Sequence, residues 1–153
     1  MATQGGFPGG GFVRFDKREI EQSIPQRFAQ QARGFSDKVA VKASDRSLTY
    51  SELDRLSNRI ARLILQTLGE GNEPVALFFD QSALLVAAIL GTLKAGKLYL
   101  PLDPVLSVSH NRDGLADSGA RLLLTEPRLR QRTKEFVPTS VTCLLYTSPS
   151  PRD

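Results

Sequence analysis

Four side chains stand where an α/β protein could bind a ligand. Asp80 and Asp103 each follow a short apolar run, Tyr99 lies within the second run, and Lys94 precedes it. Ligands of α/β proteins bind in the loops beyond the carboxyl ends of the strands. The competing interpretation is structural, because a lysine in the last turn of a helix also stabilises that helix. We favour the structural interpretation and assign no catalytic, cofactor-binding or metal-binding residue in this chain.

Two further features resemble sites only superficially. Residues 5–11 are rich in glycine, and glycine-rich loops can cradle phosphate. Such a loop needs a preceding strand, and none precedes this one, so we expect residues 1–18 to form a flexible leader. His110 is the only histidine, and no metal-ligand pattern surrounds it. We therefore expect His110 to be a solvated loop residue.

Composition narrows the class of protein. The 153 residues suffice for one domain, and 41% hydrophobic with 24% charged residues is typical of a soluble globular protein. No apolar run is long enough for a membrane span, and a single cysteine cannot form a disulfide framework, so we expect a cytoplasmic location. The net charge is +4, but the only basic cluster, residues 128–134, has no interleaved aromatic residues. We expect neither a nucleic-acid partner nor a membrane partner.

Apolar patterning alternates between strands and helices, which predicts an α/β fold with a mostly parallel sheet flanked by helices. Residues 74–79 are a continuous apolar run, as in a strand buried on both faces. The unit from 74 to 100 is predicted to be strand, helix, strand, with Pro101 ending the second strand. The predicted helices are 19–32 (with Pro25 as a candidate true start), 50–68, 83–95, 112–117 and 126–135. The predicted strands are 38–43, 74–79, 98–100, 121–125 and 136–142, with a turn at 45–47.

Residues 48–53 carry the best-specified local signal. Thr49 is placed to cap a helix, and Glu52 three residues later can reach back to the Thr49 N–H, which is a capping box. Leu48 and Leu53 flank the cap and can close a hydrophobic staple. An apolar stripe with helical period then runs to Leu68.

Two segments resemble the core motifs of one enzyme family. Residues 48–53 resemble the first core motif of the adenylation domains of nonribosomal peptide synthetases. Residues 93–104, Leu-Lys-Ala-Gly-Lys-Leu-Tyr-Leu-Pro-Leu-Asp-Pro, resemble the second. The flanking segments agree, so that the resemblance covers residues 19–142. Beyond Pro104 the family usually has another proline and an arginine, whereas this chain has Ser107 and His110 nearby.

The resemblance implies an ATP-dependent ligase. In such enzymes a carboxylic acid, usually an amino acid, attacks the α-phosphate of ATP to give an acyl adenylate. The acyl group then passes to a thiol, usually the phosphopantetheine arm of a carrier protein domain. ATP, Mg²⁺ and phosphopantetheine are therefore the implied cofactors of the whole enzyme. The family's phosphate loop, specificity pocket, ribose-binding aspartate and late catalytic lysine have no match in residues 1–142, so we expect an incomplete, inactive N-terminal subdomain that binds none of these groups.

Two alternatives remain open from the sequence. The chain could come from an acyl-CoA or aryl-acid ligase of the same superfamily, since the pocket that would decide is not within these residues. It could also be a small stand-alone binding domain with a flavodoxin-like α/β fold and no catalysis. That second alternative requires a phosphate or acidic site within the chain, and the sequence offers none that is convincing.

Residues 143–153 have a different character from the rest. Their sequence is Cys-Leu-Leu-Tyr-Thr-Ser-Pro-Ser-Pro-Arg-Asp. This peptide resembles the translation of a transposase-end adapter that is used to make sequencing libraries. We therefore expect residues 19–142 to be a partial adenylation domain and residues 143–153 to be an adapter-derived tail.

Overall fold

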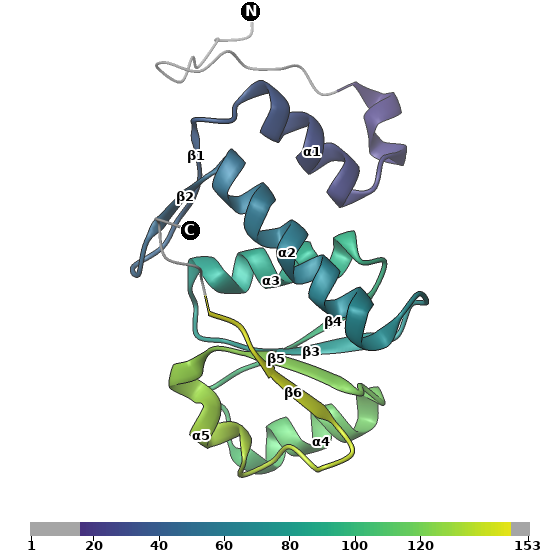
Figure 1. Ribbon diagram of the computed structural model, residues 1–153, viewed down its shortest axis with the longest axis vertical. Coiled ribbons are helices and arrows are strands. Elements are labelled where there is room, and N and C mark those ends of the chain that lie inside the picture. Colours follow the sequence, from purple (N-terminus) through teal and green to yellow (C-terminus); the bar gives the residue numbers. More distant parts are fainter. Residues whose placement is uncertain (1–15, 148–153) are drawn as a thin grey trace, which may run out of the picture.

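The chain folds into helical layers on both sides of a parallel sheet, as the computed structural model of residues 16–147 shows (Figure 1). Helices α1, α2 and α3 lie on one side of the sheet, and α4 and α5 lie on the other. The predicted α/β class is confirmed. The helical elements are η1 (Lys17–Glu21), α1 (Ile24–Gly34), α2 (Tyr50–Leu68), α3 (Ala83–Lys94), α4 (Val108–Ser118), η2 (Pro127–Leu129) and α5 (Arg130–Thr133). The strands are β1 (Val39–Lys42), β2 (Ser47–Thr49), β3 (Pro74–Phe78), β4 (Leu98–Leu102), β5 (Leu122–Thr125) and β6 (Thr142–Leu145).

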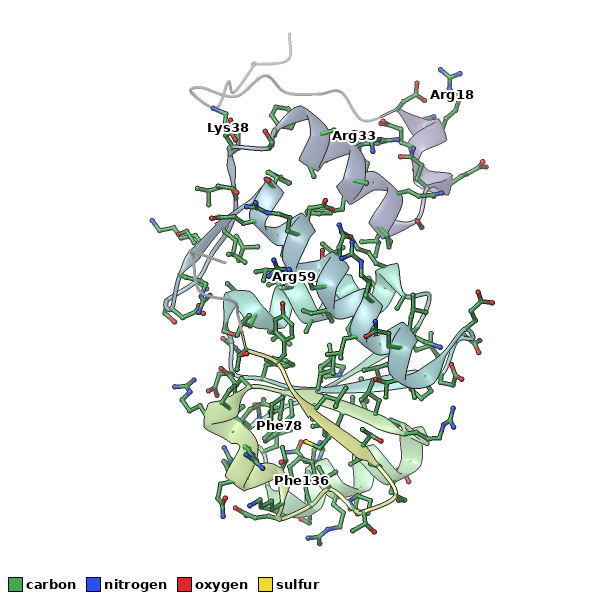
Figure 2. All side chains as sticks on the ribbon, in the orientation of Figure 1. Arg18, Arg33, Lys38, Arg59, Phe78 and Phe136 are labelled. Carbon is green, nitrogen blue, oxygen red and sulfur yellow. The ribbon has the colours of Figure 1, made fainter. Side chains whose placement is uncertain are left out.

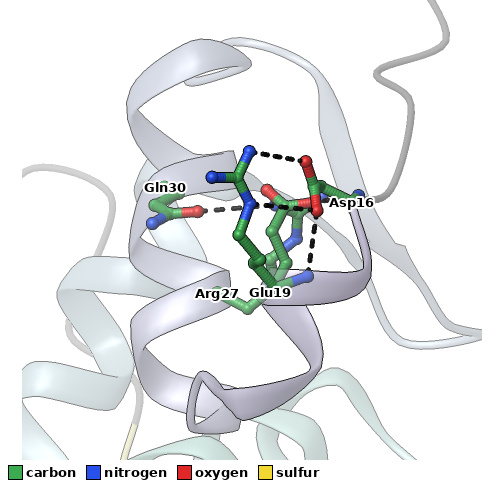
Figure 3. A network of polar contacts seen from close by, with 5 residues as sticks. Asp16, Glu19, Arg27 and Gln30 are labelled. Atoms are coloured by element: carbon green, nitrogen blue, oxygen red, sulfur yellow. Dashed lines mark hydrogen bonds and ion pairs between the residues drawn. The ribbon is translucent and has the colours of Figure 1, made fainter.

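The amino-terminal helix is split in two. We predicted one helix over 19–32, but Ser23 caps a new helix at Ile24, and Pro25 occupies its first turn, as the proline had indicated. Before the break, Asp16 caps η1, and Glu19 pairs with Arg27 across the gap (Figure 3). The expected flexible leader, residues 1–18, lies outside the described residues as far as residue 15.

Helix α2 begins as the sequence predicted. The Glu52 N–H donates to Thr49 Oγ1 at 3.2 Å, and the Thr49 N–H donates to Glu52 Oε2 at 2.8 Å. Both staple residues, Leu48 and Leu53, are buried. Gly69 follows the helix with φ +74°, a backbone conformation that a side chain would disfavour.

A small hairpin precedes α2. Strand β1 was predicted, but residues 45–47 were assigned to a turn, and the second strand was missed. Ser47 instead pairs with Lys42, and Leu48 with Val41, in an antiparallel ladder. Three residues are too few to show the alternation that is typical of a strand. Whether they form one depends on the strand with which they pair.

The main sheet has the order β4-β3-β5-β6 and is entirely parallel. Strand β3 sends Val75 and Leu77 to the face of α2 and α3, and Ala76 and Phe78 to the face of α4. All four residues are fully buried, which explains the unbroken apolar run. On the α4 face, the Phe78 ring meets Phe136 edge-on, with 5.0 Å between centroids (Figure 2).

Strand β4 corrects one prediction about proline. We expected Pro101 to stop the strand after Leu100, but the strand continues to Leu102, and Pro101 pairs in register with Leu77. Because β4 is an edge strand, a proline nitrogen that faces away from β3 costs no ladder hydrogen bond. Edge position is a property of the tertiary fold, so the sequence could not show it.

Three bounds in the second half also differ from prediction. Helix α4 begins at Val108 rather than at residue 112, because Ser107 caps it. The helix predicted over 126–135 is shorter, since η2 and α5 together end at Thr133. The last strand is Thr142–Leu145, not 136–142. Phe136 is instead a buried core residue under the sheet.

Candidate functional site

The carboxyl edge of the sheet is where a ligand would be expected. The chain crosses from β3 to β4 on one side, then returns past β3 to β5, so the winding direction changes at β3. Ligands of doubly wound sheets bind at such a switch point. In this chain the switch point is bridged by its own side chains. Glu126 Oε1 accepts the Asp80 N–H at 3.0 Å, Arg128 pairs with the Asp80 carboxylate, and Thr125 Oγ1 donates to the Phe78 carbonyl at 2.6 Å.

The helix that follows β3 has its first N–H groups engaged as well. Asp45 in the β1–β2 turn accepts the Ala83 N–H at 3.2 Å, and Ser82 Oγ accepts the Leu85 N–H at 3.3 Å. Free N–H groups at such a helix start would attract an anion. Because Asp45 and Ser82 supply the acceptors, the N–H groups of Ala83 and Leu85 are already hydrogen-bonded within the protein.

Asp103 shapes a loop. Its Oδ1 accepts the Val105 N–H at 2.8 Å, and its carbonyl accepts Asn111 Nδ2 at 2.9 Å. Arg132 from α5 donates to the neighbouring Pro104 carbonyl at 2.5 Å. Asp103 therefore holds a turn between β4 and α4. His110 is exposed, as expected, but it lies in the first turn of α4 and not in a loop, so that part of the prediction is wrong.

Tyr99 does not join Asp80 and Asp103. It lies near the amino end of β4, paired in register with Val75, and its exposed fraction is 42%. The two aspartates follow the opposite ends of their strands. The four residues singled out from the sequence therefore do not form one site.

Lys94 is the most highly connected of the four. Its Nζ lies 2.7 Å from Asp54 Oδ1 and 2.9 Å from Asn58 Oδ1, both on α2. The same ammonium lies 5.2 Å from the centroid of the Phe28 ring on α1, within cation–π range. Lys94 thus ties three helices together and joins the helix that begins in the first motif to the start of the second motif. Sequence reasoning missed Asp54 and Asn58, although their spacing of four residues places them on one side of the helix.

A second lysine lies at the amino edge of the sheet. The Lys97 side chain is fully buried, and its Nζ lies 2.5 Å from Glu73 Oε2, while Arg121 approaches Glu73 Oε1 at 3.4 Å. These residues directly precede β4, β3 and β5. The hydrogen bond from Lys97 lowers the pKa of Glu73 below its ordinary value, and the nearby charge of Arg121 acts in the same direction. The ion pairs among Lys97, Glu73 and Arg121 therefore hold the starts of β4, β3 and β5 together.

Within residues 16–147, no three His, Cys, Asp or Glu side chains cluster as metal ligands. The polar groups at the carboxyl edge already bond to one another, as described above. Within the same residues, no helix combines the length and the apolarity that a bilayer-spanning helix needs.

Comparison with known proteins decides the family. Residues 28–152 match the AMP-binding enzyme family. The chain belongs to that family. As a family member, it is 40% identical over 109 residues to surfactin synthase subunit 2 of Bacillus subtilis, an alignment that covers 71% of this chain and 3% of the synthase. It is 35% identical over 130 residues to tyrocidine synthase 1 of Brevibacillus parabrevis, covering 76% of this chain and 12% of that protein.

Solved structures share the architecture of this chain. The nonribosomal peptide synthetase FmoA3, in a form bound to alpha-methyl-L-serine-AMP, superimposes with a TM-score of 0.74 at 33% identity. That match covers 79% of this chain and 14% of FmoA3. A benzoate CoA ligase from Burkholderia xenovorans LB400 gives a TM-score of 0.73 at 20% identity, covering 80% and 25% of the two chains, which shows the shared fold. The chain thus spans a small part of each of these relatives.

Proposed function

We propose that this chain is the first part of an adenylation domain from a nonribosomal peptide synthetase. The whole enzyme would activate an amino acid with ATP, releasing pyrophosphate, and pass the acyl group from the adenylate to the phosphopantetheine thiol of a carrier domain. The 33% identity to the nonribosomal peptide synthetase FmoA3, over 79% of this chain, carries the proposal. Because FmoA3 was solved with an aminoacyl adenylate, the same similarity supports an amino acid as the substrate.

The proposed role of this part is scaffolding. Lys94, Lys97 and Asp103 each bond to other parts of the fold, so they position helices, strands and a loop rather than reactants. ATP, Mg²⁺ and phosphopantetheine would then be bound by residues in other parts of the enzyme. We further propose a cytoplasmic location, with the amino acid and the carrier domain as partners and with neither nucleic acid nor membrane.

We propose that residues 143–153 are adapter-derived and that the natural sequence departs from them after about Thr142. The eleven-residue likeness to a translated adapter supports this division. Sequencing the intact locus tests it directly. We expect the natural frame to continue from Thr142 into a glycine-rich phosphate loop within a few tens of residues. A locus that encodes Cys143 to Asp153 followed by a stop codon would contradict the proposal.

An acyl-CoA or aryl-acid ligase is the second candidate. The fold similarity to a benzoate CoA ligase favours keeping it, although 20% identity supports the fold alone. The stand-alone flavodoxin-like domain receives no support from these comparisons. Its expected switch-point site is bridged by Asp80, Glu126 and Arg128.

A graft tests the proposed function. Residues 19–142 would replace the matching segment in the adenylation domain of tyrocidine synthase 1. Amino-acid-dependent exchange of pyrophosphate into ATP would then be measured beside the unmodified domain. We expect the chimera to retain exchange with the host's own amino acid, because the host supplies the pocket and the phosphate loop. A folded chimera without exchange would contradict the proposal.

The isolated chain provides the complementary test. Each preorganised donor to the reacting phosphate is typically worth ~10²–10³ in rate, and the proposed scaffold supplies none. We expect no exchange above background with a pool of all amino acids and several aryl acids. Exchange that is clear in this chain and lost in Lys94→Ala or Asp103→Ala would show that these residues act directly in the chemistry.

A further inference from the structure

Lys97 differs from the other cations that form ion pairs in the described part of the chain. Its side chain is fully buried, whereas each of the others keeps an exposed fraction of 12% or more. Lys94 is the next most buried, but its ammonium has Asn58 as a second acceptor beside Asp54. Among residues 16–147, the Lys97 ammonium bonds to Glu73 alone. A buried charge with one partner depends on the charge of that partner.

Glu73 is held against Lys97 and is still reached by solvent. Its side chain is 31% exposed, so that it can exchange protons with water. The preceding loop fits closely around it, since a Cβ added at Gly71 would lie 2.9 Å from Glu73 Oε2. The second cation beside this carboxylate is Arg121, which is 64% exposed. Glu70 lies on the same loop, but within residues 16–147 no hydrogen bond or ion pair joins it to Glu73.

We propose that Glu73 is an acid-sensitive switch, whose protonation leaves Lys97 buried without a counter-charge and opens the amino ends of β3, β4 and β5 before their carboxyl ends. Glu73, Lys97 and Arg121 directly precede these three strands, so the switch acts on all of them. At the carboxyl edge, Asp80 pairs with Arg128, whose side chain is 71% exposed. Protonation of Asp80 leaves no buried charge unpaired, because water already solvates Arg128. The switch is independent of the proposed adenylation function.

The direction of the pH dependence follows from the environment of Glu73. The hydrogen bond from Lys97 holds the pKa of this carboxyl below its ordinary value of 4.5. The folded protein therefore binds this proton less readily than the unfolded chain does. The stabilisation from the charged pair is complete above pH 4.5 and is lost as the pH falls through the folded-state pKa. We expect the amino edge to open in that acid range and to stay closed near neutral pH.

Hydrogen exchange along single strands tests the switch. Val75 and Phe78 lie near opposite ends of β3, and both are fully buried, so their amides report the two ends of one strand. Protection factors would be measured by NMR on the 153-residue chain over a series from neutral to acid pH. Below the ordinary pKa of a glutamate, we expect protection at Val75 to fall about tenfold or more relative to Phe78. Leu122 and Thr125, which bound β5, should show the same contrast.

Matched substitutions separate the switch from acid effects elsewhere. Glu73→Gln keeps the shape and an acceptor oxygen but removes the charge, so Val75 should lose protection already at neutral pH, with no further loss in acid. Asp54→Asn makes the same change beside Lys94, which has a second acceptor, and should leave Val75 protected. Adding Lys97→Met to Glu73→Gln removes the buried charge and should restore protection at every pH.

Three outcomes would overturn the proposal. Equal losses of protection at Val75 and Phe78 in acid would show that the strand opens as a whole. A Glu73→Gln variant with the acid dependence of the starting protein would show that another group titrates. The double variant with Lys97→Met provides the same test if Glu73→Gln alone does not fold, since it should lack the acid-dependent loss at Val75, and its persistence there would contradict the switch.

Discussion

The helices on the two faces of the main sheet are not packed equally closely. On the α2–α3 face, Gly91 lets the two helices approach so closely that an added Cβ would lie 2.7 Å from Ile60 Cβ. The buried Ser57 hydroxyl on this face donates to the Leu53 carbonyl at 2.7 Å. On the α4 face, Gly114 has ordinary space around it, and the buried Asn111 has an Oδ1 with no partner among the described residues.

The first core motif lies on the α2–α3 face, with Leu48 and Leu53 in its core. The second motif contributes Ala95 to that face and Leu102 to the α4 face, and its Lys94 pairs with Asp54 on α2. The loop that departs from the family pattern leads into α4, on the opposite face. One unsatisfied group on the α2–α3 side, the Tyr146 hydroxyl, comes from the segment that we propose to be foreign, and burial raises the pKa of that hydroxyl. The close approach of α2 and α3 therefore lies on the face that carries the first core motif.

Removing a side chain from the core of the tight face should have the largest effect. Leu56 is buried on α2, so Leu56→Ala should lower the free energy of unfolding by about 2–5 kcal/mol. Leu65→Ala, on an exposed position of the same helix, is the control and should cost much less. Urea unfolding followed by far-ultraviolet circular dichroism measures both. Equal losses would mean that the helix packs on a different side.

Replacing a glycine by alanine should lower stability on the α2–α3 face but not on the α4 face. Gly91→Ala places its Cβ 2.8 Å from the Ser57 carbonyl oxygen and against Ile60, so it should cost about 1–3 kcal/mol. Gly114→Ala meets only Leu102 at 3.6 Å, an ordinary contact, and should be neutral or slightly stabilising. Thermal melts of the two variants provide the comparison. If Gly91→Ala were the milder change, the close approach of α2 and α3 would be wrong.

Removing a helix cap should cost less stability than these core changes. The cap of α2 should again matter more than the cap of α4. Thr49→Ala breaks a reciprocal capping box and should cost roughly 0.5–2 kcal/mol. Ser107 caps α4 in one direction only, through the His110 N–H, so Ser107→Ala should fall at the lower end of that range. Denaturant midpoints would rank the two. A larger loss at Ser107 would contradict the expected order.

The smallest change is expected at Asn111. Asn111→Leu removes a buried oxygen without a partner but also the 2.9 Å bond to the Asp103 carbonyl, and the two effects oppose each other. We expect stability within about 1 kcal/mol of the starting protein. Urea midpoints measured alongside Ser57→Ala, which removes a satisfied hydroxyl on the other face, test this. A loss larger than that of Ser57→Ala would show that Asn111 holds the loop more firmly than its one bond indicates.

Local signals explain what the sequence could predict. The capping box at Thr49, the proline at residue 25 and the apolar run of β3 each involve neighbours along the chain, so their meaning survives without the fold. The Ser107 cap is a signal of the same kind that was overlooked, and it would have placed the start of α4 correctly.

Tertiary relationships explain what the sequence could not predict. Strand β2 exists because Ser47 meets Lys42, and β4 passes through Pro101 because no strand lies beyond it. The structural assignment of Asp80, Asp103 and Lys94 rested on pattern alone. Their partners Arg128, Asn111 and Asp54 lie between 8 and 48 positions away along the chain, too far for any local pattern to reveal.

The position of Lys94 has a consequence for local opening of the protein. Its ammonium touches Phe28 from α1 as well as Asp54 and Asn58 from α2. If α1 frayed from the surface, it would take the aromatic cover from this charge and expose the ion pair to water. Outer helices usually open alone and at low cost, but this contact couples α1 to the two helices beneath it. We therefore expect the amino-terminal helix to open together with α2 and α3, although it forms the outermost layer.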